Sequence, residues 1–428
     1  MTASTYQPSI WQQIFSKNML LCVYTGFCSG LPYFVLIQLM QAWFTKAGLD
    51  IKTVSAFTLT SLPYTWKFLW AALLDRYSPP FLGLRRSWIF ISQLGLLAIL
   101  FSFGYLNPAE NLKIIVLLSI ALAFLSATQD IVVDAFRREI LTDNELGLGN
   151  SIHVNAYRVA GLIPGGLSLY LADHYSWQTV FLITASFMLP CLFITLFIKE
   201  PNHRPVDRNQ PFYMAFVSPF QEFVTRKGMW EAIVLILFIF LYKLGDSLAT
   251  SLQTRFILDM GFTTSHIAAV VKTTSLWCSI GGGILGGIAM LKLGVNRALW
   301  LFGFVQLITI LGFAYLASFG KFETASIGML ELIRLGVVMA GEYLGVGLGT
   351  AAFVAFMARE TNPMYTAMQL AIFTSLAAIP SKLLGAYAGK MVEAVGYYDF
   401  FWICFFLAIP GMLMLFKVAP WQEKTKQA

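Results

Sequence analysis

Long apolar runs separated by short polar connections make up most of this chain. Bounded by charged residues or Gly/Pro breaks, the runs lie at residues 18–44, 52–75, 87–106, 112–137, 149–173, 177–198, 231–258, 266–290, 297–319, 325–358, 364–390 and 398–417. About 20 apolar residues in a helix are enough to cross about 30 Å of hydrocarbon. The pattern therefore predicts an all-α membrane protein with twelve transmembrane helices.

The composition supports a membrane class. Hydrophobic residues make up 57% of the 428 residues and charged residues only 12%, whereas roughly a quarter of the residues in soluble domains are charged. The polar start, MTASTYQPSIWQQIFSKN, lacks the short apolar core and small-residue cleavage site of a signal peptide. We therefore expect the first apolar run to be an uncleaved membrane anchor.

The longest polar connection, residues 199–228, falls between the sixth and seventh runs and divides the chain nearly in half. We expect an N-terminal half of six helices at 1–198, a cytoplasmic linker at 199–230, and a C-terminal half of six helices at 231–428. Two such halves are the layout of major facilitator transporters, in which a central site is exposed alternately to each side. The MAFVSPFQEFV segment of the linker is either a short interfacial helix or unstructured.

The basic residues are distributed unequally between the two sets of loops. With the N-terminus inside, the cytoplasmic connections contain, besides the tail lysines, Arg76, Arg85, Arg86, Arg137, Arg138, Lys199, Arg204, Arg208, Arg226, Lys227, Lys292, Arg297 and Arg359. The outside loops contain only Lys46, Lys52, Lys113, Lys321 and Lys390. By the positive-inside rule this predicts that both termini are cytoplasmic. The formal charge of +7 is then explained by the basic residues of the cytoplasmic connections, and we expect no nucleic-acid partner.

Two carboxylates lie in the fourth run. Asp130 and Asp134 are four residues apart and share a helix face. Counting about 1.5 Å per residue inward from Leu112 places Asp130 in the cytoplasmic half of the membrane and Asp134 almost at the interface. A charge at membrane depth usually serves an ion or substrate pathway. We therefore interpret Asp130 as a proton carrier, unless a basic neighbour keeps it ionised, and Asp134 as part of a gate or a surface ion pair.

The connection after the second run, LLDRYSPPFLGLRRSW, resembles the acidic-then-basic signature of major facilitator proteins. In that superfamily, charge pairs of this connection latch the two halves on the cytoplasmic side. The alternative is an ordinary basic turn, and the spacing here contains an insertion with Pro79 and Pro80. The predicted cytoplasmic gate comprises Asp75, Arg76, Arg85, Arg86, Asp134, Arg137 and Arg138.

Other polar residues inside the runs are candidates for substrate contact. In the seventh run Lys243 and Asp246 are three residues apart, either as an internally neutralised pair or as part of a site. Further cations are Lys67, Arg158, Lys272, Arg334 and Lys382, against the acids Glu331 and Glu342. Lys272 and Lys382 could extend to a membrane surface. The slight excess of cations favours a substrate that bears carboxylates or phosphates. Hydrogen bonds to sugar hydroxyls or amides could come from Gln38, Gln41, Tyr64 and Gln129.

Several patterns exclude other functions. No G-x-x-x-x-G-K-[ST] phosphate loop is present, so the chain itself does not hydrolyse ATP. GGGILGG at 281–287 and GVGLGTAAF at 345–353 lie inside apolar runs, where small residues let helices pack closely. The five cysteines are scattered inside the runs and are expected to be core residues, not a disulfide framework or a metal site. None of the four histidines falls near a predicted mid-depth, and no nucleophile, base and orienting group cluster as in an enzyme.

Four segments together resemble the AmpG-type muropeptide permeases of the major facilitator superfamily. They are FCSGLPYFVLIQLMQAWF, YTWKFLWAALLDRYSPPFLGLRRSW, SATQDIVVDAFRREIL and LYKLGDSLATSL. The resemblance implies import of anhydro-muropeptides, sugar-peptide fragments of the cell wall, across the inner membrane of a Gram-negative bacterium. It also implies that the proton-motive force drives this import, with no cofactor. We expect a monomer.

The resemblance agrees with the charge pattern, because a stem peptide brings carboxylates and its N-acetyl sugars bring amides and hydroxyls. On this hypothesis Asp130 couples proton movement to transport, and Asp246 is the partner that releases Lys243. The predicted substrate-binding set is Lys67, Arg158, Lys243, Asp246, Arg334, Gln38, Gln41, Tyr64, Gln129 and Glu342. The alternatives are transport of another anionic solute, such as a peptide, an acyl-coenzyme A or a sugar phosphate, and a membrane receptor or scaffold that does not transport.

Overall fold

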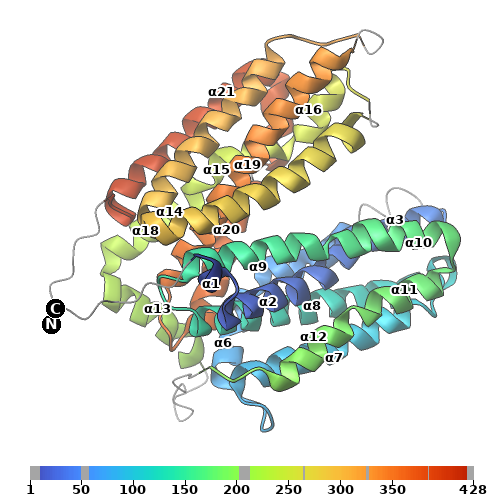
Figure 1. The fold of residues 1–428 in the computed structure, drawn as a ribbon, viewed down its shortest axis with the longest axis vertical. Coiled ribbons are helices and arrows are strands. Elements are labelled where there is room, and N and C mark those ends of the chain that lie inside the picture. The colour runs from blue at the N-terminus through green and yellow to red at the C-terminus, as the bar shows by residue number, and fades with distance from the viewer. Residues whose placement is uncertain are drawn as a thin grey trace. The chain divides into compact units, whose positions relative to one another are not determined.

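The computed structural model describes residues 10–49, 57–201, 213–263, 266–323, 327–383 and 385–421. Within these ranges all regular structure is helical, and no strand is present (Figure 1). The chain divides into two compact units. Unit 1 comprises Met1–Pro219 together with Thr361–Ile372, and unit 2 comprises Phe220–Glu360 together with Phe373–Ala428.

The helices of unit 1 follow one another along the chain with short connections, and the label η marks a short 3₁₀ or π segment. They are α1 (Ile10–Ile14), α2 (Lys17–Phe34), η1 (Val35–Leu39), α3 (Met40–Lys46), η2 (Phe57–Ser61), α5 (Leu62–Trp66), α6 (Phe68–Arg76), α7 (Leu84–Phe103), α8 (Pro108–Ile140), α9 (Leu146–Ala160), η3 (Ile163–Leu167), α10 (Ser168–His174), α11 (Trp177–Ser186) and α12 (Met188–Phe197). Side-chain caps define several starts. The Asn107 side chain accepts a hydrogen bond from the Ala109 amide, for example, ahead of α8.

Unit 2 contains longer helices. They are α14 (Met229–Tyr242), α15 (Leu244–Ser251), α16 (Gln253–Asp259), η4 (Ile267–Lys272), α18 (Thr273–Ala317), α19 (Met329–Arg359) and α21 (Gly385–Val418). Two further helices, α13 (Met214–Lys227) and α20 (Thr366–Leu383), each contain one of the three boundaries between the units. The long helices α18 and α21 each turn at a glycine with positive φ, at 72° for Gly294 and 79° for Gly396, a conformation that glycine adopts without steric cost.

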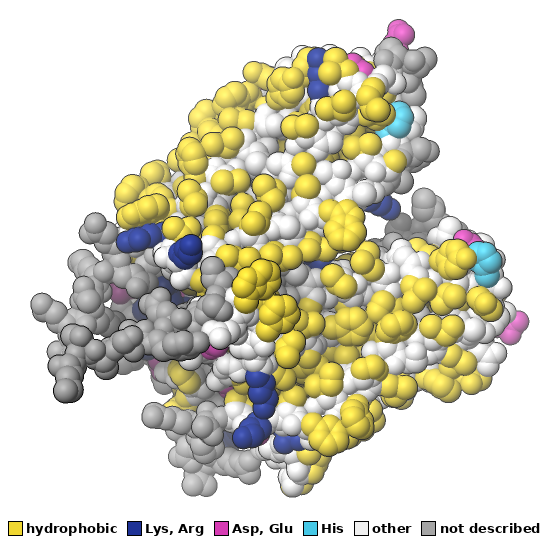
Figure 2. Space-filling model, in the orientation of Figure 1, with side chains coloured by type: hydrophobic (Ala, Val, Ile, Leu, Met, Phe, Trp, Pro, Cys, Tyr) yellow, Lys and Arg dark blue, Asp and Glu magenta, His cyan; other side chains and the backbone are white. Residues whose placement is uncertain are grey.

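Eight of the described helical segments are long and apolar enough to cross a membrane. They are Lys17–Lys46, Leu84–Phe103, Pro108–Ile140, Trp177–Phe197, Met229–Asp259, Ala269–Ala317, Met329–Arg359 and Tyr387–Val418. Large apolar side chains on them are exposed, including Phe197 (72%) and Val337 (65%). On the face drawn in Figure 2, hydrophobic side chains cover the helices, and the few charged ones lie mainly near helix ends. Such a surface suits contact with lipid.

Glycines allow helices to pack closely within each unit. In unit 2 a Cβ atom built on Gly282 would lie 2.3 Å from the Leu344 carbonyl oxygen, and one built on Gly347 would lie 2.3 Å from that of Ser279. The backbones of α18 and α19 therefore touch, which confirms the packing role predicted for both glycine-rich segments. In unit 1 Gly26 brings α2 against the backbone of α9 at His153 in the same way.

Two sequence-based expectations are resolved by the fold. The MAFVSPFQEFV segment is helical and belongs to α13, so the helical alternative is confirmed for it, while residues 202–212 of the linker lie outside the described residues. All five cysteines are free thiols, and Cys22, Cys28, Cys191 and Cys404 are buried, as predicted for core residues, whereas Cys278 is half-buried.

Candidate functional site: buried charge clusters in each unit

The carboxylate of Asp130 lies at the centre of a buried charge cluster in unit 1. It forms an ion pair with the Lys67 ammonium and accepts a hydrogen bond from the Ser29 hydroxyl at 2.6 Å. One helical turn further along α8, Asp134 lies 3.9 Å from the Lys67 Nζ and accepts a bond from Arg137 at 2.7 Å. Two carboxylates and two cations thus balance one another. We call these four residues, Lys67, Asp130, Asp134 and Arg137, the unit 1 charge cluster.

Lys67 reaches this cluster from the junction of two short helices. Lys67 stands between α5 and α6 and belongs to neither. Its side chain is 7% exposed, and a buried ammonium is tolerated only when charged partners surround it. Sequence analysis allowed for a basic neighbour of Asp130 without identifying it, and the structure shows that this neighbour is Lys67. Protonation of Asp130 would remove the main partner of Lys67 and leave Asp134 as its remaining carboxylate.

Tyrosine side chains and an amide lie next to this cluster. The Tyr33 ring is 5.0 Å from the Tyr64 ring and 5.9 Å from the Tyr157 ring, centroid to centroid. The Tyr64 hydroxyl donates to the Ser126 hydroxyl at 2.6 Å. Gln129, fully buried, donates to the Cys28 carbonyl at 2.6 Å. Sequence analysis named Tyr64 and Gln129 but missed Tyr33 and Tyr157, which as uncharged aromatic residues carry no distinguishing signal.

The remaining predicted substrate residues of unit 1 lie elsewhere along the helices. The Gln38 side chain lies against Gly165 of η3, and its buried carbonyl oxygen has no hydrogen-bond partner among the described residues. Gln41 is half-buried in α3, and Arg158 is half-buried near the end of α9. His153, which sequence analysis set aside, is buried in α9 and shares a 3.0 Å hydrogen bond with the Thr25 hydroxyl.

The predicted gate contains a second cluster, which is fully buried. The Arg85 guanidinium is 0% exposed and lies 2.7 Å from both the Asp75 and the Glu139 carboxylates. Asp75 also accepts hydrogen bonds from the backbone amides of Ala367 and Met368, at 3.3 and 3.0 Å, at the start of α20. A carboxylate at a helix N-terminus complements its unpaired amides. Sequence analysis missed Glu139, although it directly follows the basic pair at 137–138.

Other predicted gate residues make separate contacts. Arg86 donates to the carbonyls of Thr195 and Leu196 at the end of α12, at 3.2 and 2.6 Å. Arg138 pairs with the exposed Asp143 at 3.0 Å. Arg76 is buried, with its guanidinium 5.7 Å from the centre of the Tyr77 ring. The structure therefore brings Asp75 and Arg85 together, whereas Asp134 and Arg137 belong to the unit 1 charge cluster.

Unit 2 contains its own group of buried charges. Lys243 stands between α14 and α15, and its ammonium lies 3.4 Å from the Asp246 carboxylate. The Glu342 carboxyl group of α19 is fully buried and lies near the Asp246 carboxylate and the Lys243 ammonium. We call Lys243, Asp246 and Glu342 the unit 2 charge cluster. As in unit 1, the lysine stands at the junction of two consecutive helices.

Arg334 does not join the unit 2 charge cluster. It lies near the start of α19, about 12 Å along the helix from Glu342 at about 1.5 Å per residue. Its guanidinium is 4.5 Å from the centre of the Phe319 ring and 3.9 Å from the Glu331 carboxylate. Arg334 is thus placed near one end of the helix. The side chain of Lys382 lies outside the described residues.

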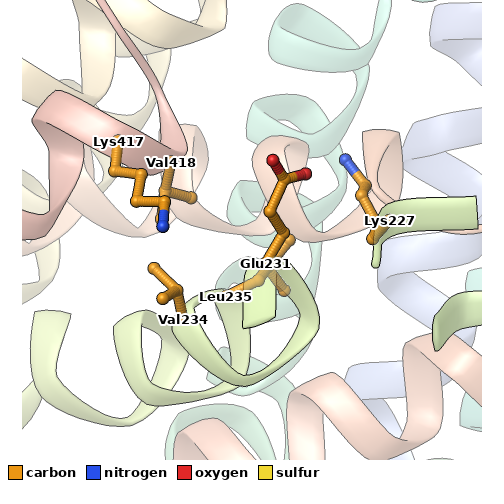
Figure 3. A pocket seen from close by; sticks show the side chains of 6 residues that line it. All are labelled: Lys227, Glu231, Val234, Leu235, Lys417 and Val418. Carbon is orange, nitrogen blue, oxygen red and sulfur yellow. The ribbon is translucent and has the colours of Figure 1, made fainter. Parts of the chain in front are cut away.

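A small pocket in unit 2 shares no lining residue with the unit 2 charge cluster (Figure 3). It has a volume of about 110 Å³ and is lined by Lys227, Glu231, Val234, Leu235, Lys417 and Val418. Lys227 is already paired with Glu360, and the Lys417 ammonium lies 5.1 Å from the centre of the Trp230 ring. Sites for drug-sized ligands measure about 300–1,000 Å³, so this pocket is too small for a sugar-peptide. Among the described residues, no group of three or more His, Cys, Asp or Glu could hold a metal ion.

Comparison with known proteins first defines the class. The profile of the Major Facilitator Superfamily matches residues 65–358. The fold is similar to that of FucP, a major facilitator transporter solved in the outward conformation, with a TM-score of 0.69, 14% identity, and coverage of 94% of this chain and 99% of that chain. The chain therefore belongs to the major facilitator superfamily, a class of membrane transporters, and it is not an enzyme.

Two relatives narrow the assignment. The anhydromuropeptide permease of Escherichia coli K12 is 37% identical over 95% of this chain and 80% of its own length. A protein of Haemophilus influenzae described as uncharacterized is 60% identical over 98% of both chains. Within the superfamily, the chain is thus an AmpG-type permease.

Proposed function

We propose that the protein imports anhydro-muropeptides from the periplasm to the cytoplasm for peptidoglycan recycling, by alternating access driven by the proton-motive force. The observation that carries this proposal is the 37% identity to an anhydromuropeptide permease across 95% of the chain.

In the proposed mechanism Asp130 couples proton movement to transport. The proton passes from periplasmic water to the Asp130 carboxylate, which then releases Lys67 to bind a substrate carboxylate. The contact that supports this role is the Lys67–Asp130 ion pair, because the loss of one charge frees the other. Deprotonation toward the cytoplasm restores the ion pair and displaces the substrate.

Polar groups from the predicted substrate-binding set are proposed to contact the substrate. Lys67, Arg158, Lys243 and Arg334 hold the carboxylates of the stem peptide. The sugar part meets tyrosine and amide groups, which stack on or hydrogen-bond to N-acetyl sugars, and these groups are Tyr64, Gln38, Gln41 and Gln129. Support comes from Gln38 and Gln129, whose side-chain oxygens are buried without a hydrogen-bond partner among the described residues, because such orphaned groups are usually satisfied by a ligand or by water.

The proposed topology has twelve transmembrane helices and cytoplasmic termini, in the inner membrane of a Gram-negative bacterium. Division of α18 at Gly294 and of α21 at Gly396 separates helices that would otherwise count as one. The stretches 57–76 and 146–174, interrupted by short 3₁₀ and π segments, then supply two more crossings. We propose that the protein acts as a monomer and that the Asp75, Arg85 and Glu139 cluster belongs to the cytoplasmic gate.

The test is uptake of labelled N-acetylglucosaminyl-anhydromuropeptide into proteoliposomes of known orientation, with and without an inward proton gradient. Gradient-stimulated accumulation is expected. The absence of uptake by folded, correctly oriented protein would reject muropeptide as the substrate, and gradient-independent uptake would reject proton coupling. Competition by unlabelled peptides, sugar phosphates and acyl-coenzyme A then defines which part of the substrate is recognised.

A further inference from the structure

The Glu342 carboxyl group is buried without a donor for either of its oxygens. Glu342 is 0% exposed, and neither Oε atom has a hydrogen-bond donor among the described residues. It lies about 20 Å from Met329 and about 26 Å from Arg359 along α19, at about 1.5 Å per residue. An ionised carboxylate this deep in an apolar helix bundle is costly unless it is paired and hydrogen-bonded.

Among the described residues, the groups that face Glu342 leave both of its carboxyl oxygens without a hydrogen-bond donor. From α15 the Asp246 carboxyl group lies beside that of Glu342, and Lys243 lies near both carboxyl groups. Lys243 is directed to the Asp246 Oδ2 atom at 3.4 Å, while the Asp246 Oδ1 atom has no partner among the described residues. From α18 the Thr309 hydroxyl is nearby, but its proton is donated to the Gln306 carbonyl at 3.0 Å.

The two units therefore differ in their charge balance. The unit 1 charge cluster has two carboxylates and two cations, whereas the unit 2 charge cluster has two carboxylates and one cation. If both unit 2 carboxyl groups were ionised, two acceptor-only groups would face each other with excess negative charge. One proton removes both problems, because a protonated carboxyl group can donate a hydrogen bond to its ionised neighbour.

We propose that Glu342 and Asp246 share one proton and form a second proton-binding site of the transport cycle, in addition to Asp130. This deepens the proposed function and rests on it for the coupling to muropeptide. Binding takes one proton from water and converts one carboxylate into a carboxylic acid. Release returns the proton to water and leaves two carboxylates next to a single lysine. That deprotonated state favours a rearrangement of Lys243 toward both carboxylates.

The test uses the full-length protein with Glu342→Gln, which imitates the protonated, neutral side chain. Asp246→Asn is its companion, and Glu393→Gln, an exposed carboxylate of α21, is the matched control. Two transport readouts are compared in proteoliposomes: accumulation of labelled muropeptide under a proton gradient, and exchange of labelled for unlabelled muropeptide without a gradient. For each variant, gradient-driven accumulation is divided by its own exchange rate. This ratio is expected to fall to the level seen without a gradient in Glu342→Gln and to stay at the wild-type level in Glu393→Gln. Gradient-driven accumulation by Glu342→Gln at the wild-type level would overturn the proposal.

An independent readout separates this proposal from the muropeptide assignment. Infrared difference spectra of the purified protein between low and high pH report the carbonyl stretch of buried carboxylic acids without any substrate. We expect a band that is lost in Glu342→Gln, shifted in Asp246→Asn and unchanged in Glu393→Gln. If wild type transports no muropeptide but shows this band, only the proposed function fails. If Glu342→Gln leaves the spectrum unchanged, the shared proton is rejected whatever the substrate is.

Discussion

The Lys67 ammonium and the Asp130 carboxylate form a largely buried ion pair between the junction of α5 and α6 and the interior of α8. Ser29 of α2 donates a further hydrogen bond to the same carboxylate. Three helical segments thus meet at one charge. Because Asp134 lies 3.9 Å from the Lys67 Nζ, the lysine retains one carboxylate neighbour when Asp130 is neutralised.

Replacement of Asp130 tests its coupling role. Asp130→Asn keeps the size and polarity of the side chain but cannot be deprotonated, and we expect uptake that no longer responds to an imposed pH gradient. The measurement is initial uptake in proteoliposomes at several gradients. Asp173→Asn, which alters an exposed ion pair with Lys46, is the control. An undiminished gradient response of Asp130→Asn would show that Asp130 does not couple.

Replacement of Arg85 is expected to lower the stability of the protein strongly. Arg85→Met leaves the carboxylates of Asp75 and Glu139 buried without their shared cation, and removal of one partner from a buried ion pair typically costs about 3–5 kcal/mol. We expect the midpoint of thermal unfolding of the detergent-solubilised protein to fall clearly. Arg255→Met is the matched control, because Arg255 is 73% exposed and its pair with Asp259 belongs to the class of surface pairs that contribute little.

The close contact at Gly282 predicts that a larger side chain does not fit between α18 and α19. A methyl group at this position would meet the Leu344 carbonyl oxygen at 2.3 Å, whereas one at Gly281 would meet nothing within 4 Å. Overpacking of this kind costs about 1–3 kcal/mol. Gly282→Ala is therefore expected to lower the unfolding midpoint and Gly281→Ala to leave it nearly unchanged. Equal effects of the two variants would contradict the close packing of these helices.

Gly165 offers a test of Gln38 that leaves Gln38 in place. A Cβ atom at Gly165 would lie 2.0 Å from the Gln38 Oε1 atom, and one at the adjacent Gly166 would be free of contacts. Because the far end of Gln38 can rotate away, we expect Gly165→Ala to raise the KM for muropeptide uptake with little effect on folding. Gly166→Ala should keep the wild-type KM. An unchanged KM in Gly165→Ala would argue that the position of the Gln38 amide is not used in binding.

Local patterns predicted much of the architecture. Hydropathy along the chain indicated a helical membrane protein, and the small residues at 281–287 and 345–353 indicated close helix contacts that GGGILGG and GVGLGTAAF indeed make. These properties depend on neighbours within one helix or on residue size, so they can be read from the sequence. The grouping of residues 361–372 with unit 1 has no such local signal, because their partners are distant along the chain.

The sequence by itself determined the class of protein and most of the charged residues that matter, because a charge inside an apolar run is visible without any structure. Tertiary structure decided which charges neutralise each other. Lys67 and Asp130 are 63 residues apart, Arg85 and Glu139 are 54 apart, and Asp75 reaches the Met368 amide across 293 residues. Helix packing sets these distances, and only packing shows that Glu342 lies beside Asp246 with one cation for two carboxyl groups.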